Sequence, residues 1–462
     1  MLSRCEEAQD GWSRSRGMPG AANRRRSVGL VVACAGLALT LGLVAADASP
    51  TPSFERPQSF AAGRGPTSVA IGDLNGDGKR DLATANGSSD TVSVLLNRGG
   101  RRFGSRLDYK AGEAPVSLAI GDLNGDRKPD LATANYQAGT VSTLVNGGDG
   151  SFKHKVDYAT GSASYAVAIG DLNGDRKSDV AVTSDARTAS VLINTGGGSF
   201  EAKRDFGTGH GPVSIAIGDL NGDRKPDLVT TNIFEGTVSV LVNRGDGTFK
   251  DKVDYATGPS PSSVAVGDLN GDGKLDLVTA NADPSYMHTV SVLTNAGGRF
   301  RAKVNFKTGK HPASVAIADL NGDGKPDLVT ANLFSRTLSV LANAGAGSFR
   351  RRRDYRVEGK PVSLAIADLN GDHKPDLAAA NTNNVSVLLN ARGRCVVPVV
   401  RGTPSSFARS EITLANCRVG KIRRAYSNTV TRGYVISEKP KPWTVLRRGG
   451  IVNLVVSRGR KQ

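Results

Sequence analysis

Asp73-Leu-Asn-Gly-Asp-Gly-Lys-Arg-Asp81 is the first copy of an acidic segment that recurs along the chain. Recurrence every 48 to 51 residues indicates a repeat architecture, in which each unit buries its apolar surface against its neighbours. The 462 residues are therefore expected to contain an array of seven similar units. The five-residue start of the segment returns, after spacings of 49, 49, 48, 49, 51 and 49 residues, at Asp122, Asp171, Asp219, Asp268, Asp319 and Asp368.

One complete unit runs from residue 214 to residue 258. Its β-branched segments are short and are separated by Gly, Asn, Asp and Pro, which predicts strands at 214–218, 228–231, 237–242 and 249–255. Four strands of this length form one small antiparallel sheet. Such a sheet cannot bury both faces alone, so neighbouring units must stack.

The two ends of the array differ from its middle. Six units end in a Phe followed six residues later by a second aromatic residue, but the seventh stops after residues 385–389. Phe54, Phe60 and Gly63 supply the missing pattern ahead of the first acidic segment. A strand from the N-terminus that completes the last sheet would close a ring and remove its free edges. We therefore predict an all-β, seven-bladed β-propeller of four-stranded antiparallel blades over residues 49–393, closed by this N-terminal strand.

The acidic segments have the composition of calcium loops. Positions 1, 3, 5 and 9 are Asp, Asn, Asp and Asp in every copy, and the carbonyl at position 7 (Lys79) adds another oxygen. Hard oxygen donors without His, Cys or Met suit Ca²⁺. An EF-hand is excluded because position 12 is never Glu, whereas seven metal-free Asx turns are the alternative. Non-Gly residues at position 6 (Arg127, Arg176, Arg224 and His373) are expected to weaken their sites.

We expect up to seven structural Ca²⁺ ions. The predicted ligands are Asp73, Asn75, Asp77 and Asp81; Asp122, Asn124, Asp126 and Asp130; Asp171, Asn173, Asp175 and Asp179; Asp219, Asn221, Asp223 and Asp227; Asp268, Asn270, Asp272 and Asp276; Asp319, Asn321, Asp323 and Asp327; and Asp368, Asn370, Asp372 and Asp376.

With this sevenfold motif, residues 54–393 resemble the FG-GAP/VCBS repeat family of integrin α-subunit heads and many bacterial surface proteins. The resemblance implies a propeller whose acidic loops bind calcium. That family is mostly adhesive, and some members accompany enzymes, so the resemblance does not fix a ligand.

Residues 394–462 differ in composition, with 15 Lys and Arg against Glu411 and Glu438. We expect a helix over 405–417 and strands at 431–437 and 451–457. The Cys395-Val-Val-Pro opening, the 433–440 run and the 452–459 ending resemble a PASTA domain, a small α+β module usually found outside bacterial cells and associated with peptidoglycan recognition. Cys395 and Cys417 form an even pair suited to a disulfide in an oxidising compartment.

Residues 1–48 have the layout of a secretory signal. Arg24, Arg25 and Arg26 precede an uncharged stretch over 28–46, and small-x-small sites follow at 44–46 and 46–48. This pattern predicts a cleaved signal peptide, with an uncleaved anchor as the alternative. We therefore expect a secreted protein or one at the bacterial cell surface or wall.

The expected function is binding rather than catalysis. The five His are scattered without metal spacing and no nucleophile motif occurs, so no catalytic residue is predicted. Seven Ca²⁺ would raise the net charge of residues 49–393 from +2 to +16, which favours an anionic wall polymer, peptidoglycan or another glycan, or a surface protein. Nucleic acid is the other polyanion, but the chain lacks a nucleic-acid-binding motif. The alternatives are a carbohydrate-binding lectin and a polysaccharide-active hydrolase or lyase.

The loops between second and third strands lie on the face opposite the acidic loops. Apolar and aromatic residues in these loops mark a candidate ligand face, the alternative being packing against the next blade. The candidates are Tyr136, Phe234, Tyr286, His288, Phe334 and Arg336.

Overall fold

The computed structural model describes residues 52–283 and 288–461. The predicted leader and Tyr286 lie outside these residues. The regular elements of the described chain are strands, apart from one ten-residue helix. None of its helices has the length and apolar composition that crossing a membrane requires.

Seven four-stranded antiparallel sheets make up the repeat region. Each contains a first strand of seven residues, a second strand that is buried throughout, a third strand, and a fourth strand that is largely exposed. The first strands are β2 (Pro66–Gly72), β8 (Pro115–Gly121), β12 (Ser164–Gly170), β18 (Pro212–Gly218), β22 (Pro261–Gly267), β26 (Pro312–Ala318) and β32 (Pro361–Ala367). The second strands are β3 (Asp81–Asn86), β9 (Asp130–Asn135), β13 (Asp179–Ser184), β19 (Asp227–Asn232), β23 (Asp276–Asn281), β27 (Asp327–Asn332) and β33 (Asp376–Asn381).

The third and fourth strands complete each sheet. The third strands are β4 (Thr91–Leu95), β10 (Thr140–Leu144), β14 (Thr188–Leu192), β20 (Thr237–Leu241), β24 (Thr289–Leu293), β28 (Thr337–Leu341) and β34 (Asn384–Leu388). The fourth strands are β7 (Leu107–Lys110), β11 (Val156–Ala159), β17 (Arg204–Gly207), β21 (Val253–Ala256), β25 (Val304–Lys307), β31 (Arg353–Arg356) and, in the last sheet, β1 (Gln58–Ala61).

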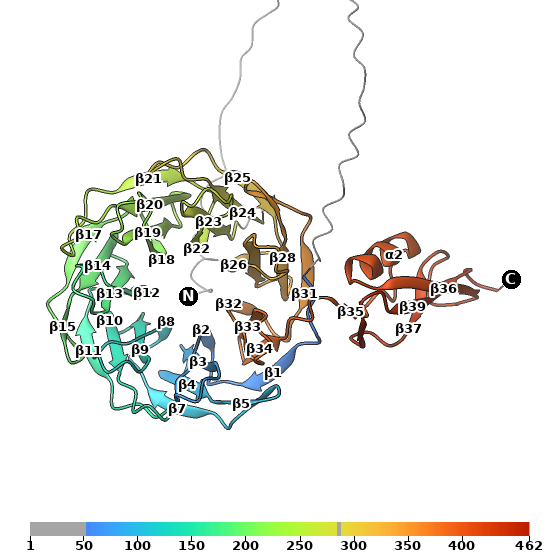
Figure 1. Ribbon diagram of the computed structural model, residues 1–462, viewed down its shortest axis with the longest axis horizontal. Coiled ribbons are helices and arrows are strands. Elements are labelled where there is room, and N and C mark those ends of the chain that lie inside the picture. The colour runs from blue at the N-terminus through green and yellow to red at the C-terminus, as the bar shows by residue number, and fades with distance from the viewer. Residues whose placement is uncertain (1–51, 284–287, 462) are drawn as a thin grey trace, which may run out of the picture. The chain divides into compact units, whose positions relative to one another are not determined.

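The N-terminal strand belongs to the last sheet. β1 pairs antiparallel with β34, with Phe60 opposite Val385, and an isolated bridge joins Phe54 to Asn390. In Figure 1 the sheets follow one another around a common centre, and β2 of the first sheet contacts β32 of the last. Repeated four-stranded antiparallel sheets in this order fit a β-propeller.

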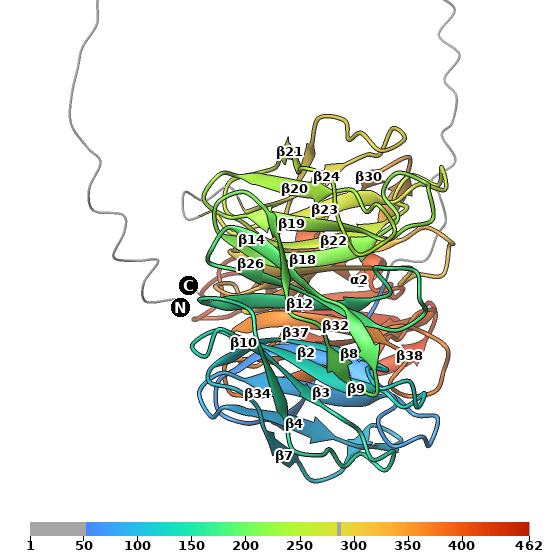
Figure 2. The same cartoon turned by 90° about the vertical axis from the view of Figure 1, so that its left-hand side faces the viewer.

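First strands of adjacent sheets are joined by a recurring side-chain hydrogen bond. The Ser68 hydroxyl accepts from the backbone N–H of Leu118 in the next sheet (3.2 Å). The Ser363 hydroxyl of the last sheet likewise accepts from Val69 of the first (3.2 Å). Figure 2 shows the first strands β12, β18 and β22 side by side.

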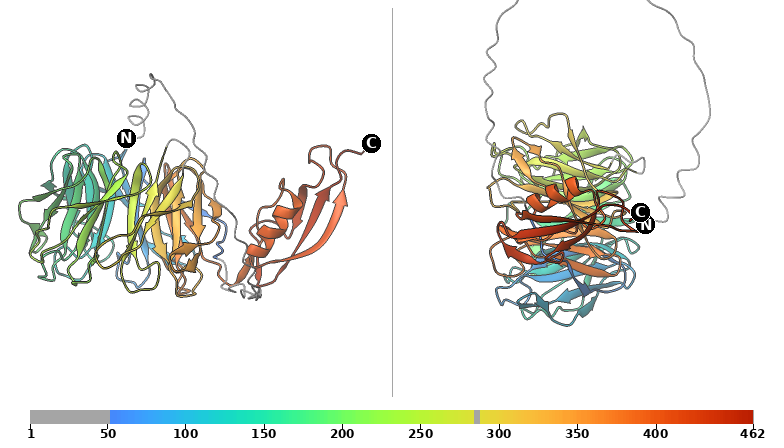
Figure 3. Two further views of the ribbon diagram at one scale, coloured as in Figure 1. Left: turned by 90° about the horizontal axis from the view of Figure 1, so that it is seen from above. Right: turned by 90° about the vertical axis from the view of Figure 1, so that its right-hand side faces the viewer.

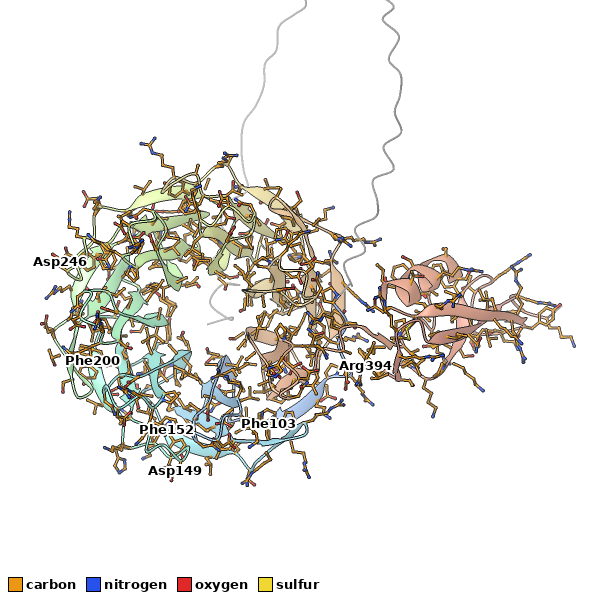
Figure 4. All side chains as sticks on the ribbon, viewed as in Figure 1. Phe103, Asp149, Phe152, Phe200, Asp246 and Arg394 are labelled. Atoms are coloured by element: carbon orange, nitrogen blue, oxygen red, sulfur yellow. A yellow bond between two sulfur atoms is a disulfide. The ribbon has the colours of Figure 1, made fainter. Side chains whose placement is uncertain are left out.

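Aromatic pairs join the outer parts of adjacent sheets. The rings of Tyr109 and Phe152 pack edge to face, with 5.2 Å between their centroids. The equivalent rings of Tyr158 and Phe200 have centroids 5.1 Å apart. Figure 4 labels Phe103, Phe152 and Phe200, each at the outer side of its sheet. Phe60 packs on Phe103 in the same way, so the N-terminal segment supplies an aromatic residue to this series.

The predicted fourth strand over 249–255 is wrong at its start, because β21 begins only at Val253. Phe249 instead belongs to the preceding turn, where it bridges Asn243 and is buried against Phe206. Three equivalent turns form two-stranded ribbons: β5 (Asn97–Gly99) with β6 (Arg102–Phe103), β15 (Asn194–Gly196) with β16 (Ser199–Phe200), and β29 (Asn343–Gly345) with β30 (Ser348–Phe349).

The C-terminal residues form an α+β unit. Its elements are β35 (Arg394–Val396), α2 (Ser405–Leu414), β36 (Arg418–Ala425), β37 (Val435–Lys439), β38 (Val445–Arg447) and β39 (Ile451–Ser457). Figure 3 shows α2 along one face of β36, β39 and β37, where Ala408 and Ile412 contribute to the core. A disulfide joins Cys395 on β35 to Cys417, as expected.

Two predicted elements of this unit have different bounds in the structure, and two of its strands, β36 and β38, were not predicted. The helix ends at Leu414 rather than 417, and the strand expected at 431–437 covers Val435–Lys439. β36 was not predicted, because its many Arg and Lys residues obscure an apolar pair, Val419 and Ile422, that packs on the core.

Candidate metal centres and ligand face

Each acidic loop joins the first strand of a sheet to the second. Gly72 pairs with Asp81 across the hairpin, so position 9 is the first residue of the second strand. Positions 4 and 6 have left-handed backbone, with φ of 72° at Gly76 and 78° at Gly78. Arg127 and His373 occupy position 6 with φ of 66° and 59°. These two residues therefore adopt a left-handed backbone conformation, which is energetically unfavourable for residues other than glycine.

Positions 1, 3 and 5 direct their oxygens at the backbone of their own loop. Oδ2 of Asp73 accepts from the N–H of Gly78 (2.9 Å), and Oδ1 of Asn75 accepts from Asp77 (3.1 Å). Oδ1 of Asp77 accepts from Lys79 (2.9 Å). The same three bonds occur in all seven loops, so the structure brings these positions together on one turn.

Position 9 is buried and already hydrogen-bonded. Oδ2 of Asp81 accepts from the N–H of Leu74 (2.8 Å), and Oδ1 accepts from Asn97 (2.7 Å). The other six copies make the same pair of bonds. This carboxylate therefore fastens its loop to the turn after the third strand.

Burial raises the pKa of every position-9 carboxyl, and the carboxylates at positions 5 and 1 raise it further. The pKa is about 6 for Asp227 and about 7 for Asp327 and Asp376. The carboxylates at positions 1 and 5 are thus near enough to disfavour a negative charge at position 9.

Lysine at position 7 is a partner that the sequence analysis missed. Nζ of Lys79 contacts Oδ2 of Asp77 at 2.8 Å, and this hydrogen bond lowers the pKa of Asp77. The position-5 carboxylates of loops 2, 3, 5 and 7 have the same partner. The available signal was a Lys at position 7 in all seven copies.

The acidic loop of each sheet is bonded to the next sheet. Nδ2 of Asn146 donates to the carbonyl of Leu74 in the preceding loop (2.9 Å). Asn97 of the first sheet donates to Leu369 of the last (2.8 Å), and the remaining five sheets repeat the bond. The loops therefore lie at contacts between sheets.

A second polar network, also missed, lies at the opposite end of the sheets. Nδ2 of Asn86 donates to the hydroxyl of Ser93 (2.8 Å), which donates to Oδ1 of Asp108 (2.6 Å). A Cβ on Gly63 would lie 2.5 Å from Asn86 Nδ2, which explains the glycine in the fourth-strand pattern. The recurring Asn at the end of the second strand was the available signal.

The candidate ligand face contains two exposed phenylalanines backed by histidines. Phe234 is 68% exposed, and its ring centroid lies 4.7 Å from that of His210. Phe334 is 55% exposed and lies 4.5 Å from His311.

The other candidates have different surroundings. Tyr136 packs on Tyr165 of the next sheet, which supports local packing at this position. Nδ1 of His288 accepts from the backbone N–H of His311 (3.2 Å), and burial lowers the pKa of both imidazoles. Arg336 is exposed.

FG-GAP-like repeats are matched six times, over residues 73–133, 122–182, 171–230, 221–279, 268–330 and 319–379. The chain belongs to the FG-GAP-like repeat family. A PASTA domain is matched over residues 396–458. Both matches confirm the resemblances inferred from the sequence.

Individual proteins resemble this FG-GAP-like repeat chain either over a short segment or at low sequence identity. A probable serine/threonine-protein kinase of Clostridium acetobutylicum is 38% identical over 63 residues, and the match spans 14% of this chain and 10% of the kinase. The crystal structure of BBS1N in complex with ARL6DN has a TM-score of 0.54 at 13% identity, covering 74% of this chain and 98% of that one. The latter likeness concerns the fold alone.

The FG-GAP-like repeat loops offer the donors that calcium takes. Oδ1 of Asp73 and Oδ2 of Asp323 are buried without a hydrogen-bond partner, and a cation would satisfy them. As the described residues stand, no three Asp, Glu, His or Cys side chains form a group that could hold a metal ion. The reason is that position 9 faces backbone N–H groups and position 5 often faces a lysine. The residue types fit Ca²⁺, although many of the side-chain oxygens already accept hydrogen bonds from the backbone of their own loop.

Proposed function

We propose that the seven sheets are the blades of a closed propeller. Two recurring contacts support closure, because each also joins the last sheet to the first. The aromatic series includes Phe60 against Phe103, and the asparagine series includes Asn97 with the Leu369 carbonyl. Phe54, bridged to Asn390 and packed on Tyr355, takes the place of the turn phenylalanine that follows the third strand in the other sheets.

We further propose that the acidic loops bind up to seven structural Ca²⁺ ions. In the first loop, Asp73, Asn75 and Asp77 with the Lys79 carbonyl would hold the ion, and Asp81 would join them through lone pairs not used by its two backbone donors. The ion supplies positive charge that offsets carboxylate repulsion. The unpartnered oxygens of Asp73 and Asp323 support this proposal.

Taken together, these features favour an exported, non-enzymatic binding or adhesion protein of the bacterial cell surface or wall. The observation that carries the proposal is the combination of FG-GAP-like repeats with a PASTA domain whose segment, residues 394–462, carries 15 basic residues against two acidic ones. PASTA domains in general bind peptidoglycan-related ligands. A surplus of basic residues attracts anionic wall polymers through long-range electrostatics.

The test is co-sedimentation of the purified protein with insoluble peptidoglycan, with and without attached anionic polymer, in calcium and in EDTA. The proposal predicts retention on the wall that falls as ionic strength rises. Equal amounts of protein in the pellet with and without wall material would refute it. Release of soluble fragments from a labelled wall would instead indicate the hydrolase or lyase alternative.

Exposed aromatic rings favour a carbohydrate-binding lectin as the second candidate function. Phe234 and Phe334 present apolar rings to solvent from equivalent loops, a feature typical of binding surfaces. Changing both to Ala should abolish binding on a glycan array. The matched control changes Val253 and Val304, which are also exposed but lie on fourth strands. Unchanged binding by the Phe variant would place the ligand elsewhere.

A further inference from the structure

One turn of the repeat array departs from the other six. Each third strand is followed by an Asn whose Oδ1 accepts from the backbone N–H two residues later. In the last sheet this residue is Arg392, which follows Asn390. In the first six sheets it is glycine: Gly99, Gly148, Gly196, Gly245, Gly297 and Gly345.

The position occupied by Arg392 lies beside the acidic loop of the preceding sheet. In the equivalent places, the carbonyls of Gly148 and Gly245 lie near Gly76 and Gly174 of the preceding loops. The Arg392 guanidinium lies so close to Gly322 of loop 6 that a Cβ added to that glycine would overlap it. A permanently charged group thus lies against Gly322, at position 4 of the loop formed by Asp319 to Asp327.

Loop 6 is also the most shielded of the seven. Asn321 at position 3 is only 3% exposed, whereas its equivalents in the other loops are half-buried. Asp323 at position 5 is half-buried, whereas its six equivalents are exposed. Oδ2 of Asp323 is buried without a hydrogen-bond partner. Asn321 and Asp323 flank Gly322, the residue against which the Arg392 guanidinium lies.

We propose that Arg392 acts as a built-in cation over loop 6 and makes calcium loading unequal. Six loops take calcium, and the sixth loop of the chain binds it more weakly by at least about tenfold, because an incoming divalent ion meets a fixed like charge. This inference rests on the proposed calcium binding. In this inference Arg392 opposes the metal ion electrostatically and is not one of its ligands.

Counting bound ions by native mass spectrometry, in a calcium buffer that fills the other loops, tests the inference. The wild-type chain is expected to carry six ions and Arg392→Ala seven. Arg394→Ala removes an exposed arginine two residues away and should retain six. The double variant Arg392→Ala with Asp323→Asn should return to six, which locates the additional ion in loop 6. Arg392→Gly, which copies the other six turns, provides a second variant.

Each outcome bears on a different proposal. The same nonzero number of ions in the wild type and in both Arg392 variants would overturn the role of Arg392 and leave calcium binding standing. No bound calcium in any variant would refute the calcium proposal, and this inference with it. An additional ion that persists after Asp323→Asn would place that ion outside loop 6 and overturn the inference as well.

Discussion

Replacing the position-9 carboxylate separates the structural role of an acidic loop from its metal-binding role. Asp227 is fully buried, and its two oxygens accept from the backbone N–H groups of Asn243 (2.8 Å) and Leu220 (3.0 Å). In Asp227→Ala both donors lose their partner inside the protein, at a cost of about 1–3 kcal/mol each. Removing a buried charge offsets part of this cost. We expect a net loss of about 3 kcal/mol in EDTA.

Asp223→Ala, at position 5 of the same loop, is the matched control. Asp223 is exposed, and its removal in EDTA should change the free energy of unfolding by less than about 0.5 kcal/mol. Equilibrium urea unfolding followed by far-UV circular dichroism measures both variants. In calcium, both should lose the stabilisation contributed by one ion. Equal losses for the two variants in EDTA would refute the structural role given to Asp227.

Three further predictions concern pH, backbone strain and closure. The pKa of Asp327 and Asp376 is about 7 against an ordinary 3.8, so the native protein retains protons that the unfolded chain releases. Without metal, the free energy of unfolding should therefore increase as the pH is lowered from 8 to 6, by up to about 1.4 kcal/mol per pH unit and group. A decrease over this range would contradict the prediction. Arg176→Gly relieves a φ of 66° and should stabilise the protein by about 1 kcal/mol, so a lower Tm would count against the strain argument. Phe54→Ala removes a buried ring 5.1 Å from Tyr355 and should cost about 3–5 kcal/mol; a loss below about 1 kcal/mol would show that this segment does not hold the last sheet.

The fold could be predicted from the sequence because the repeat constrains it seven times over. Hairpins around the acidic loops follow from the motif, and the pairing of β1 with β34 follows from the aromatic spacing at Phe54 and Phe60. The sequence predicts one continuous strand from Phe249 to the next aromatic residue, Tyr255. The actual position of Phe249, in a turn against the neighbouring sheet, depends on a contact outside its own unit.

The residues of the candidate site could be predicted from the sequence, but the partners that their side chains face could not. The sequence does not distinguish a buried Asp that accepts backbone hydrogen bonds from an Asp at the same position that binds calcium. The role of Asp81 was therefore ambiguous. The lysine partner of Asp77 and the guanidinium over loop 6 were overlooked because their roles depend on which charges come together in space. Recognising the role of Arg392 also requires a comparison of the turns that follow the third strands of the different sheets.

Thermal unfolding of metal-stripped protein, with and without calcium, decides whether the acidic loops are metal sites. Calcium at about 10⁻³ M should raise Tm, because ions that bind the native state alone stabilise it, and the same concentration of Mg²⁺ should raise it far less. Asp77→Asn should reduce the calcium-dependent increase. Superimposable melting curves in calcium and in excess EDTA would contradict the proposal that these carboxylates hold a divalent ion.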